Sequence, residues 1–158
     1  MFKILKNTFL VVILGIFISA CSTTAKKSKS VSAAGDVYTG TDTVKYLATG
    51  VADRVFFATN STGLTSAAKA TLTKQAGYIK ASKISVVIEG HADERGTREY
   101  NLALGERRAN AARDYLMTKG IAKSSIKVIS YGKERPANTD SSKLAWSQNR
   151  RSVTVKAN

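Results

Sequence analysis

The sequence predicts an α/β sandwich for residues 51–158, in which two helices pack on one face of a small mixed sheet. Two observations carry this prediction. Two segments repeat apolar residues at helical spacing, and short runs rich in β-branched and aromatic residues precede and follow them. The resulting order is strand, helix, strand, helix, strand, loop and strand. About 108 residues can bury one modest core, so we expect a single domain.

The first strand and first helix are expected between residues 53 and 81. Residues 53–58 are rich in aromatic and β-branched side chains, which indicates a strand, and residues 60–63 are typical of a turn. Thr65 can cap a helix that runs to about residue 81. Its predicted core side chains are Leu64, Ala68, Leu72, Ala76 and Ile79.

The second strand and second helix follow a similar pattern. Residues 84–89 are nearly all apolar, which predicts a central strand, and a charged loop follows at residues 90–97. A helix is expected from about residue 100 to residue 118, where Gly120 can end it. Its predicted core stripe is Leu102, Gly105, Ala109, Ala112 and Leu116. The remaining expected elements are a strand at 126–131, a loop at 133–142, a helical turn at 144–148 and a last strand at 151–156.

Residues 1–20 have the order of a secretory signal peptide. Lys3 and Lys6 supply positive charge, residues 9–18 form an apolar run, and small residues precede Cys21. The apolar run would rise only ~15 Å as a helix, which is too short for a ~30 Å hydrocarbon core. An N-terminal membrane anchor or a buried helix is the alternative.

Residues 18–21 read Ile-Ser-Ala-Cys, which resembles a bacterial lipobox. This resemblance implies cleavage before Cys21 and lipidation of that cysteine with acyl chains such as palmitate. Cys21 is the only cysteine, so no internal disulfide can form. Ser22 replaces the Asp that usually signals inner-membrane retention, which favours the outer membrane. Residues 21–50 are expected to form a flexible tether, with partial order at most around residues 44–47.

The chain is strongly basic. Its formal charge is +14, or +12 without Lys3 and Lys6. Such a charge often indicates nucleic acid, but a secreted protein meets little of it, so we expect no nucleic-acid partner. Anionic cell-wall polymer and lipid headgroups are the available partners, and a generally basic proteome explains the charge equally well.

The most informative polar residues follow the predicted central strand. Asp93 lies in the loop at residues 90–97, and Arg108 lies at the border of the buried face of the next helix. A carboxylate and a guanidinium presented together suit a zwitterionic ligand. The alternative is a structural ion pair between Asp93 and Arg108. If both residues are ligand groups, we expect their replacement to cost little stability and much binding.

Four separated motifs resemble one known family. They occupy residues 90–97 with 100–101, then 106–110, 130–136 and 148–151. They closely resemble the OmpA-like peptidoglycan-binding domain, and in particular its peptidoglycan-associated lipoprotein branch. The resemblance extends from about residue 53 to residue 155, and the lipobox supports it independently.

The resemblance implies a specific ligand and specific roles. Asp93 would receive the ammonium group of diaminopimelate in the peptide stem, and Arg108 would receive its carboxylate. Asn101 would supply a supporting amide. Asn60 lies in a loop that lines the pocket in relatives, where many of them carry Asp. The further candidate site residues are Arg95, Thr97 and Leu104.

The resemblance also implies a cellular role. The expected protein is an outer-membrane lipoprotein that binds peptidoglycan non-covalently and supports envelope integrity and cell division within the Tol–Pal system. Its expected partners are peptidoglycan, the outer membrane through the lipid on Cys21, and the periplasmic β-propeller protein TolB. The alternative is a periplasmic protein-interaction module that does not bind the wall.

An enzyme is the main rival class. His91 is the only histidine and Cys21 the only cysteine, so a zinc site lacks ligands. No histidine lies near a plausible serine nucleophile in an independent motif. We therefore expect no catalysis, no metal and no cofactor, and we expect His91 to shape its loop.

Overall fold

The computed structural model describes residues 36–157. The predicted signal peptide, the lipidation of Cys21 and the first part of the predicted tether lie outside the described residues. Within residues 36–157, no helix is long and apolar enough to span a membrane.

A four-stranded mixed sheet forms the centre of the domain. Its strand order is β3-β6-β4-β5. β3 (Arg54–Phe56) pairs antiparallel with β6 (Arg151–Lys156), and β6 pairs antiparallel with β4 (Val86–His91). β4 pairs in parallel with β5 (Ile126–Gly132). The predicted mixed sheet is confirmed, and the apolar strand β4 has a neighbour on both sides, as expected of a central strand.

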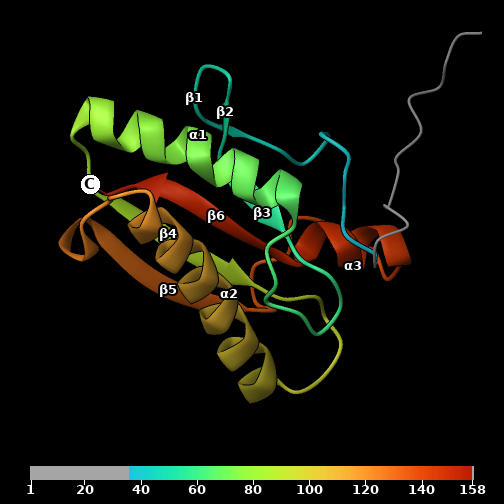
Figure 1. Cartoon of the computed structure of the whole chain (residues 1–158). Coiled ribbons are helices and arrows are strands. Elements are labelled where there is room, and N and C mark those ends of the chain that lie inside the picture. The colour runs from blue at the N-terminus through green and yellow to red at the C-terminus, as the bar shows by residue number, and fades with distance from the viewer. Residues whose placement is uncertain (1–35, 158) are drawn as a thin grey trace, which may run out of the picture.

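Two long helices cover one face of this sheet, as predicted. α1 (Ser66–Ser82) and α2 (Arg98–Thr118) lie side by side on that face (Figure 1). The hydroxyl of Thr65 accepts a hydrogen bond from the backbone N–H of Ala68, which caps α1 as the sequence predicted. The shorter elements are the hairpin of β1 (Tyr46–Ala48) and β2 (Val51–Ala52), the 3₁₀ helix η1 (Lys123–Ser125) and α3 (Lys143–Asn149).

The predicted helical stripes meet in one core. The side chains of Leu72, Ile79 and Leu116 are almost completely buried there against Val86 and Ile88 of β4. Leu64 and Leu102, which were predicted as core positions, are only half-buried because they lie at the N-terminal ends of the two stripes.

A close approach between two glycines sets the position of α2. A Cβ atom at Gly90 would lie 1.9 Å from the carbonyl oxygen of Gly105, so neither position has room for a larger side chain. The middle of α2 therefore lies directly over the C-terminal end of β4. This contact brings the helix residue Arg108 next to the loop that leaves that strand.

The folded part begins earlier than the sequence predicted. Residues 36–50 were expected to belong to the tether, but Val37 and Tyr38 are buried and pack with Phe56. The ring of Tyr38 meets that of Phe56 edge-on at 4.8 Å. Leu47 of β1 joins the main core. The boundary at residue 50 is therefore wrong for this part, because a few apolar side chains in a polar segment suffice to fix it against the sheet.

Candidate ligand-binding pocket

A pocket of about 360 Å³ opens beyond the C-terminal end of β4. The β3–α1 loop, the β4–α2 loop and the first half of α2 enclose it, and Figure 1 shows both loops at the same end of the sheet as α3. Six of the seven residues that the sequence singled out for the ligand line this pocket: Asn60, Asp93, Arg95, Asn101, Leu104 and Arg108. Thr59, Gly96 and Tyr100 complete the lining.

Thr97 is the predicted site residue that lies elsewhere. Its hydroxyl accepts a hydrogen bond from the backbone N–H of Tyr100 at 3.2 Å and so caps α2. Gly96 just before it has a φ of +93°, a conformation that L side chains rarely adopt. Thr97 therefore shapes the wall of the pocket through the start of the helix.

Asp93 is buried and engaged by two arginines. Arg95 donates from Nε to Oδ1 at 3.0 Å and from Nη2 to Oδ2 at 2.7 Å, and its backbone N–H lies 3.2 Å from Oδ1. Arg150 donates from Nη1 to Oδ2 at 3.3 Å. Burial alone would raise the pKa of Asp93, but the hydrogen bonds and positive charges of these arginines hold that pKa below its usual value. The carboxylate is therefore ionised at neutral pH.

Arg108 is fully buried and is held by backbone carbonyls. Its Nε donates to Ser61 O at 3.0 Å, Nη1 to His91 O at 2.9 Å and Nη2 to Ala58 O at 3.0 Å. Within residues 36–157, all its hydrogen-bond acceptors are such neutral oxygens. A guanidinium carries five N–H groups, so two of them take no part in these three hydrogen bonds. Burial lowers the pKa of Arg108 to about 10, which still leaves it charged at neutral pH.

These contacts exclude the structural alternative for Asp93 and Arg108. Among the described residues, the ion-pair partners of Asp93 are Arg95 and Arg150, so a direct Asp93–Arg108 pair does not form. The contacts also correct the expected stability effect for Arg108. Its replacement would leave three carbonyls without their donor, so we now expect a moderate loss of stability, about 1–3 kcal/mol.

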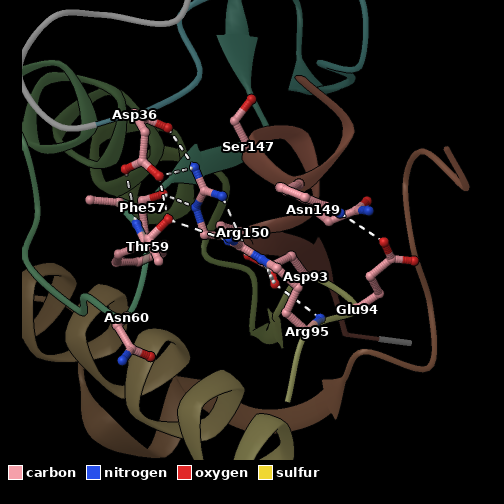
Figure 2. A network of polar contacts seen from close by, with 12 residues as sticks. Asp36, Phe57, Thr59, Asn60, Asp93, Glu94, Arg95, Ser147, Asn149 and Arg150 are labelled. Carbon is pink, nitrogen blue, oxygen red and sulfur yellow. Dashed lines mark hydrogen bonds and ion pairs between the residues drawn. The ribbon is translucent and has the colours of Figure 1, made fainter. Parts of the chain in front are cut away.

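Arg150 is the residue that sequence reasoning did not place in the site. It follows α3 and is 98% buried, and Figure 2 shows it between Asp36 on one side and Asp93 on the other. Its Nη2 lies 2.9 Å from Asp36 Oδ2, and its Nε donates to Phe57 O at 3.0 Å. The only sequence signal was its place in the motif at residues 148–151, which gave no role for it.

The β4–α2 loop is fastened on its outer side. The Nε1 of Trp146 in α3 donates to Glu94 Oε1 at 2.8 Å, and the guanidinium of Arg95 lies 4.3 Å from the centre of the Trp146 ring. Lys133 Nζ donates to the carbonyls of Glu94 and Gly96. The loop therefore has a defined shape before any ligand arrives.

The amide residues of the pocket hold its walls. Asn101 is buried and its Nδ2 donates to Arg95 O at 2.9 Å, so it supports the loop from inside. Asn60 is exposed with a φ of +57°, a conformation that Asn tolerates better than most residues, and it accepts a hydrogen bond from the Tyr100 hydroxyl. Leu104 is buried and supplies an apolar surface.

His91 lies behind the pocket wall, at the end of β4. It is buried, and burial together with the charges of Arg151, Arg54 and Arg135 lowers its pKa to about 3. The ring is therefore neutral at physiological pH and only a weak base. In the part of the chain that the structure describes, no group of three His, Cys, Asp or Glu residues could hold a metal ion.

The residues that line the pocket carry more positive than negative charge. The guanidinium groups of Arg95 and Arg108 stand against the single carboxylate of Asp93. The fold and this site define a small α/β domain with a polar pocket whose positive charge suits an anionic group.

The chain belongs to the OmpA family, whose model matches residues 56–150. The peptidoglycan-associated lipoprotein of Mesorhizobium japonicum is 56% identical over 106 residues, which are 66% of this chain and 63% of that protein. The protein of the same name from Pseudomonas aeruginosa is 48% identical over 96 residues, covering 61% of this chain and 57% of that protein. The chain thus spans about three fifths of the length of the curated relatives it matches.

Solved structures agree with this assignment. The crystal structure of the peptidoglycan-associated lipoprotein from Burkholderia pseudomallei superposes with a TM-score of 0.64 at 37% identity, over 66% of this chain and 90% of that one. The cell wall anchor of the type VI secretion system from Pseudomonas aeruginosa superposes with a TM-score of 0.57 at 24% identity, which shows a shared fold only.

Proposed function

We propose that this protein is an outer-membrane lipoprotein that binds peptidoglycan non-covalently through the pocket beyond β4. One observation carries the proposal: Arg108 is a buried positive charge that three carbonyls position and that forms no direct ion pair among residues 36–157, in the same pocket as Asp93. The names of the relatives, peptidoglycan-associated lipoproteins, support this choice of ligand.

Diaminopimelate in the peptide stem has the chemistry that this pocket suits. Its free end carries an ammonium group and a carboxylate on one carbon atom. Asp93 would receive the ammonium, and the two remaining N–H groups of Arg108 would receive the carboxylate. Asn101 would act by holding the backbone of Arg95 in place. These are binding roles and require no chemical step.

Co-sedimentation with purified sacculi tests this proposal. We expect Arg108→Gln and Asp93→Asn each to lose about ten- to a hundredfold in affinity, because each removes a charge-assisted contact. Arg107→Gln is the matched control for Arg108→Gln, because Arg107 is an exposed neighbour on the same helix. Urea unfolding of each variant separates lost binding from lost folding. Normal sedimentation of both pocket variants would reject the site.

The proposed anchoring rests on Cys21 and the residues before it. Transfer of lipid to Cys21 and cleavage after Ala20 would tether the domain to the outer membrane, and two or more acyl chains give firm attachment. Mass spectrometry of the N-terminus of the protein from its own cells is the test. An unacylated Cys21, or retention of residues 1–20, would contradict this part of the proposal.

We include the Tol–Pal system in the proposal because of the family resemblance. A complex with TolB on a surface that overlaps the pocket would exclude peptidoglycan, so a soluble stem peptide should weaken that complex. The measurement is binding of purified TolB with and without the peptide. Undiminished binding at saturating peptide would place TolB on another surface.

A further inference from the structure

We propose that Arg95 competes with the ligand inside the pocket: in the free protein its guanidinium occupies the carboxylate of Asp93, and binding exchanges it for the ammonium group of the ligand. This inference rests on the proposed function and deepens it, because it makes Arg95 a residue that determines which ligands can enter.

The acceptor sites of Asp93 are already filled. An ionised carboxylate offers about four lone-pair sites. Oδ1 accepts from the Nε and the backbone N–H of Arg95, and Oδ2 accepts from Nη2 of Arg95 and Nη1 of Arg150. An incoming ammonium group must therefore displace one of these donors before it can bind Asp93.

Arg95 is the donor that can leave. Its side chain is 43% exposed, whereas that of Arg150 is 2% exposed and also tied to Asp36 and Phe57. The Trp146 ring already lies 4.3 Å from the Arg95 guanidinium and offers it a surface when it leaves the carboxylate. The backbone bond from Arg95 to Asp93 does not need to break in this exchange.

The exchange makes the pocket selective. A ligand with a carboxylate alone can bind Arg108 but leaves Arg95 on Asp93. A ligand that carries both groups has its carboxylate held by Arg108 and its ammonium placed to replace the guanidinium. Arg95 was expected from the sequence to contribute to ligand binding. In the proposed exchange Arg95 instead lowers the affinity for the ligand, because its guanidinium must leave Asp93 before the ammonium group can bind.

The direction in which Arg95→Gln changes the affinity for a stem peptide tests this inference. We would titrate the full-length protein, purified in detergent, with a soluble stem tripeptide that ends in diaminopimelate, by calorimetry. Arg95→Gln removes the competing charge and should bind the peptide about three- to tenfold more tightly, since a half-exposed ion pair contributes modestly. Arg107→Gln removes the same charge from the exposed face of α2 and should bind like the wild type.

Equal or weaker binding by Arg95→Gln would overturn this inference and leave the proposed function intact, provided that the wild type binds. No binding by either protein would overturn both. A second measurement does not depend on a variant. The Nε–H signal of Arg95 in nuclear magnetic resonance spectra should lose its protection from solvent exchange when the peptide saturates the protein. Unchanged protection at saturation would also overturn the inference.

Discussion

Arg108 lines the pocket and Arg150 contacts its Asp93, and the protein holds these two buried guanidinium groups in different ways. Among the described residues, the hydrogen bonds of Arg108 go to neutral carbonyls of the β3–α1 loop and β4, whereas Arg150 contacts the carboxylates of Asp36 and Asp93. Burying an uncompensated charge is costly. Under the proposed function, the difference separates a charge kept available for a ligand from a charge used to fix the N-terminal segment and the loop.

The largest expected effect comes from removing the neutralised arginine. Arg150→Met should lower the free energy of unfolding by about 3–5 kcal/mol, because it removes one of the two arginines that neutralise the buried carboxylate of Asp93 and leaves two backbone carbonyls without their donor. Urea unfolding of the variant gives this value, and Arg107→Met on the exposed face of α2 is the control. A loss below about 1 kcal/mol would show that Arg150 is not needed to hold Asp93.

His91 tests whether the same region tolerates a further positive charge. Its folded pKa of about 3 lies below the value of ~6.5 in an unfolded chain, so between these values only the unfolded state takes up the proton. Stability should therefore fall as the pH decreases, by about 2 kcal/mol from pH 6.5 to pH 5. Above pH 5 most carboxyl groups stay ionised and contribute little to this slope.

Thermal or urea unfolding at several pH values measures this dependence. His91→Gln should flatten the curve in that window, because it removes the group that titrates. An equally steep curve for His91→Gln would assign the pH dependence to other groups.

The smallest expected effect concerns Asn60. Asn60→Asp adds a carboxylate to the exposed edge of the pocket, where Asp also tolerates the positive φ. An exposed pair contributes about 0.2–1 kcal/mol, so the stem tripeptide should bind up to about fivefold more tightly at low salt. The gain should vanish at high salt because exposed charges are screened. A gain that persists in 1 M salt would indicate a direct, desolvated contact instead.

The sequence predicted the local features of this fold well. The apolar spacing located α1, α2 and the central strand β4, because burial on one face leaves a pattern within each element. The same helical geometry predicted Arg108 at the border of the buried face, whereas the structure buries it completely. The sheet order was not readable in this way, because it depends on which distant strands pair.

The missed features depend on contacts between distant residues. Arg150 lies 57 residues from Asp93 and 114 residues from Asp36, and no local pattern joins these positions. The burial of Val37 and Tyr38 depends in the same way on Phe56. A short polar segment with two apolar residues cannot be distinguished from a tether until its contact surface is known.

A double-mutant cycle between ligand and protein tests most directly whether Arg108 is the charge kept for the ligand. The wild type and Arg108→Gln would be titrated by calorimetry with the stem tripeptide and with the same peptide amidated at the diaminopimelate carboxylate. Amidation should weaken binding to the wild type about ten- to a hundredfold and should change binding to Arg108→Gln very little. An equal loss for both proteins would contradict the assignment, because the carboxylate would then be recognised by another group.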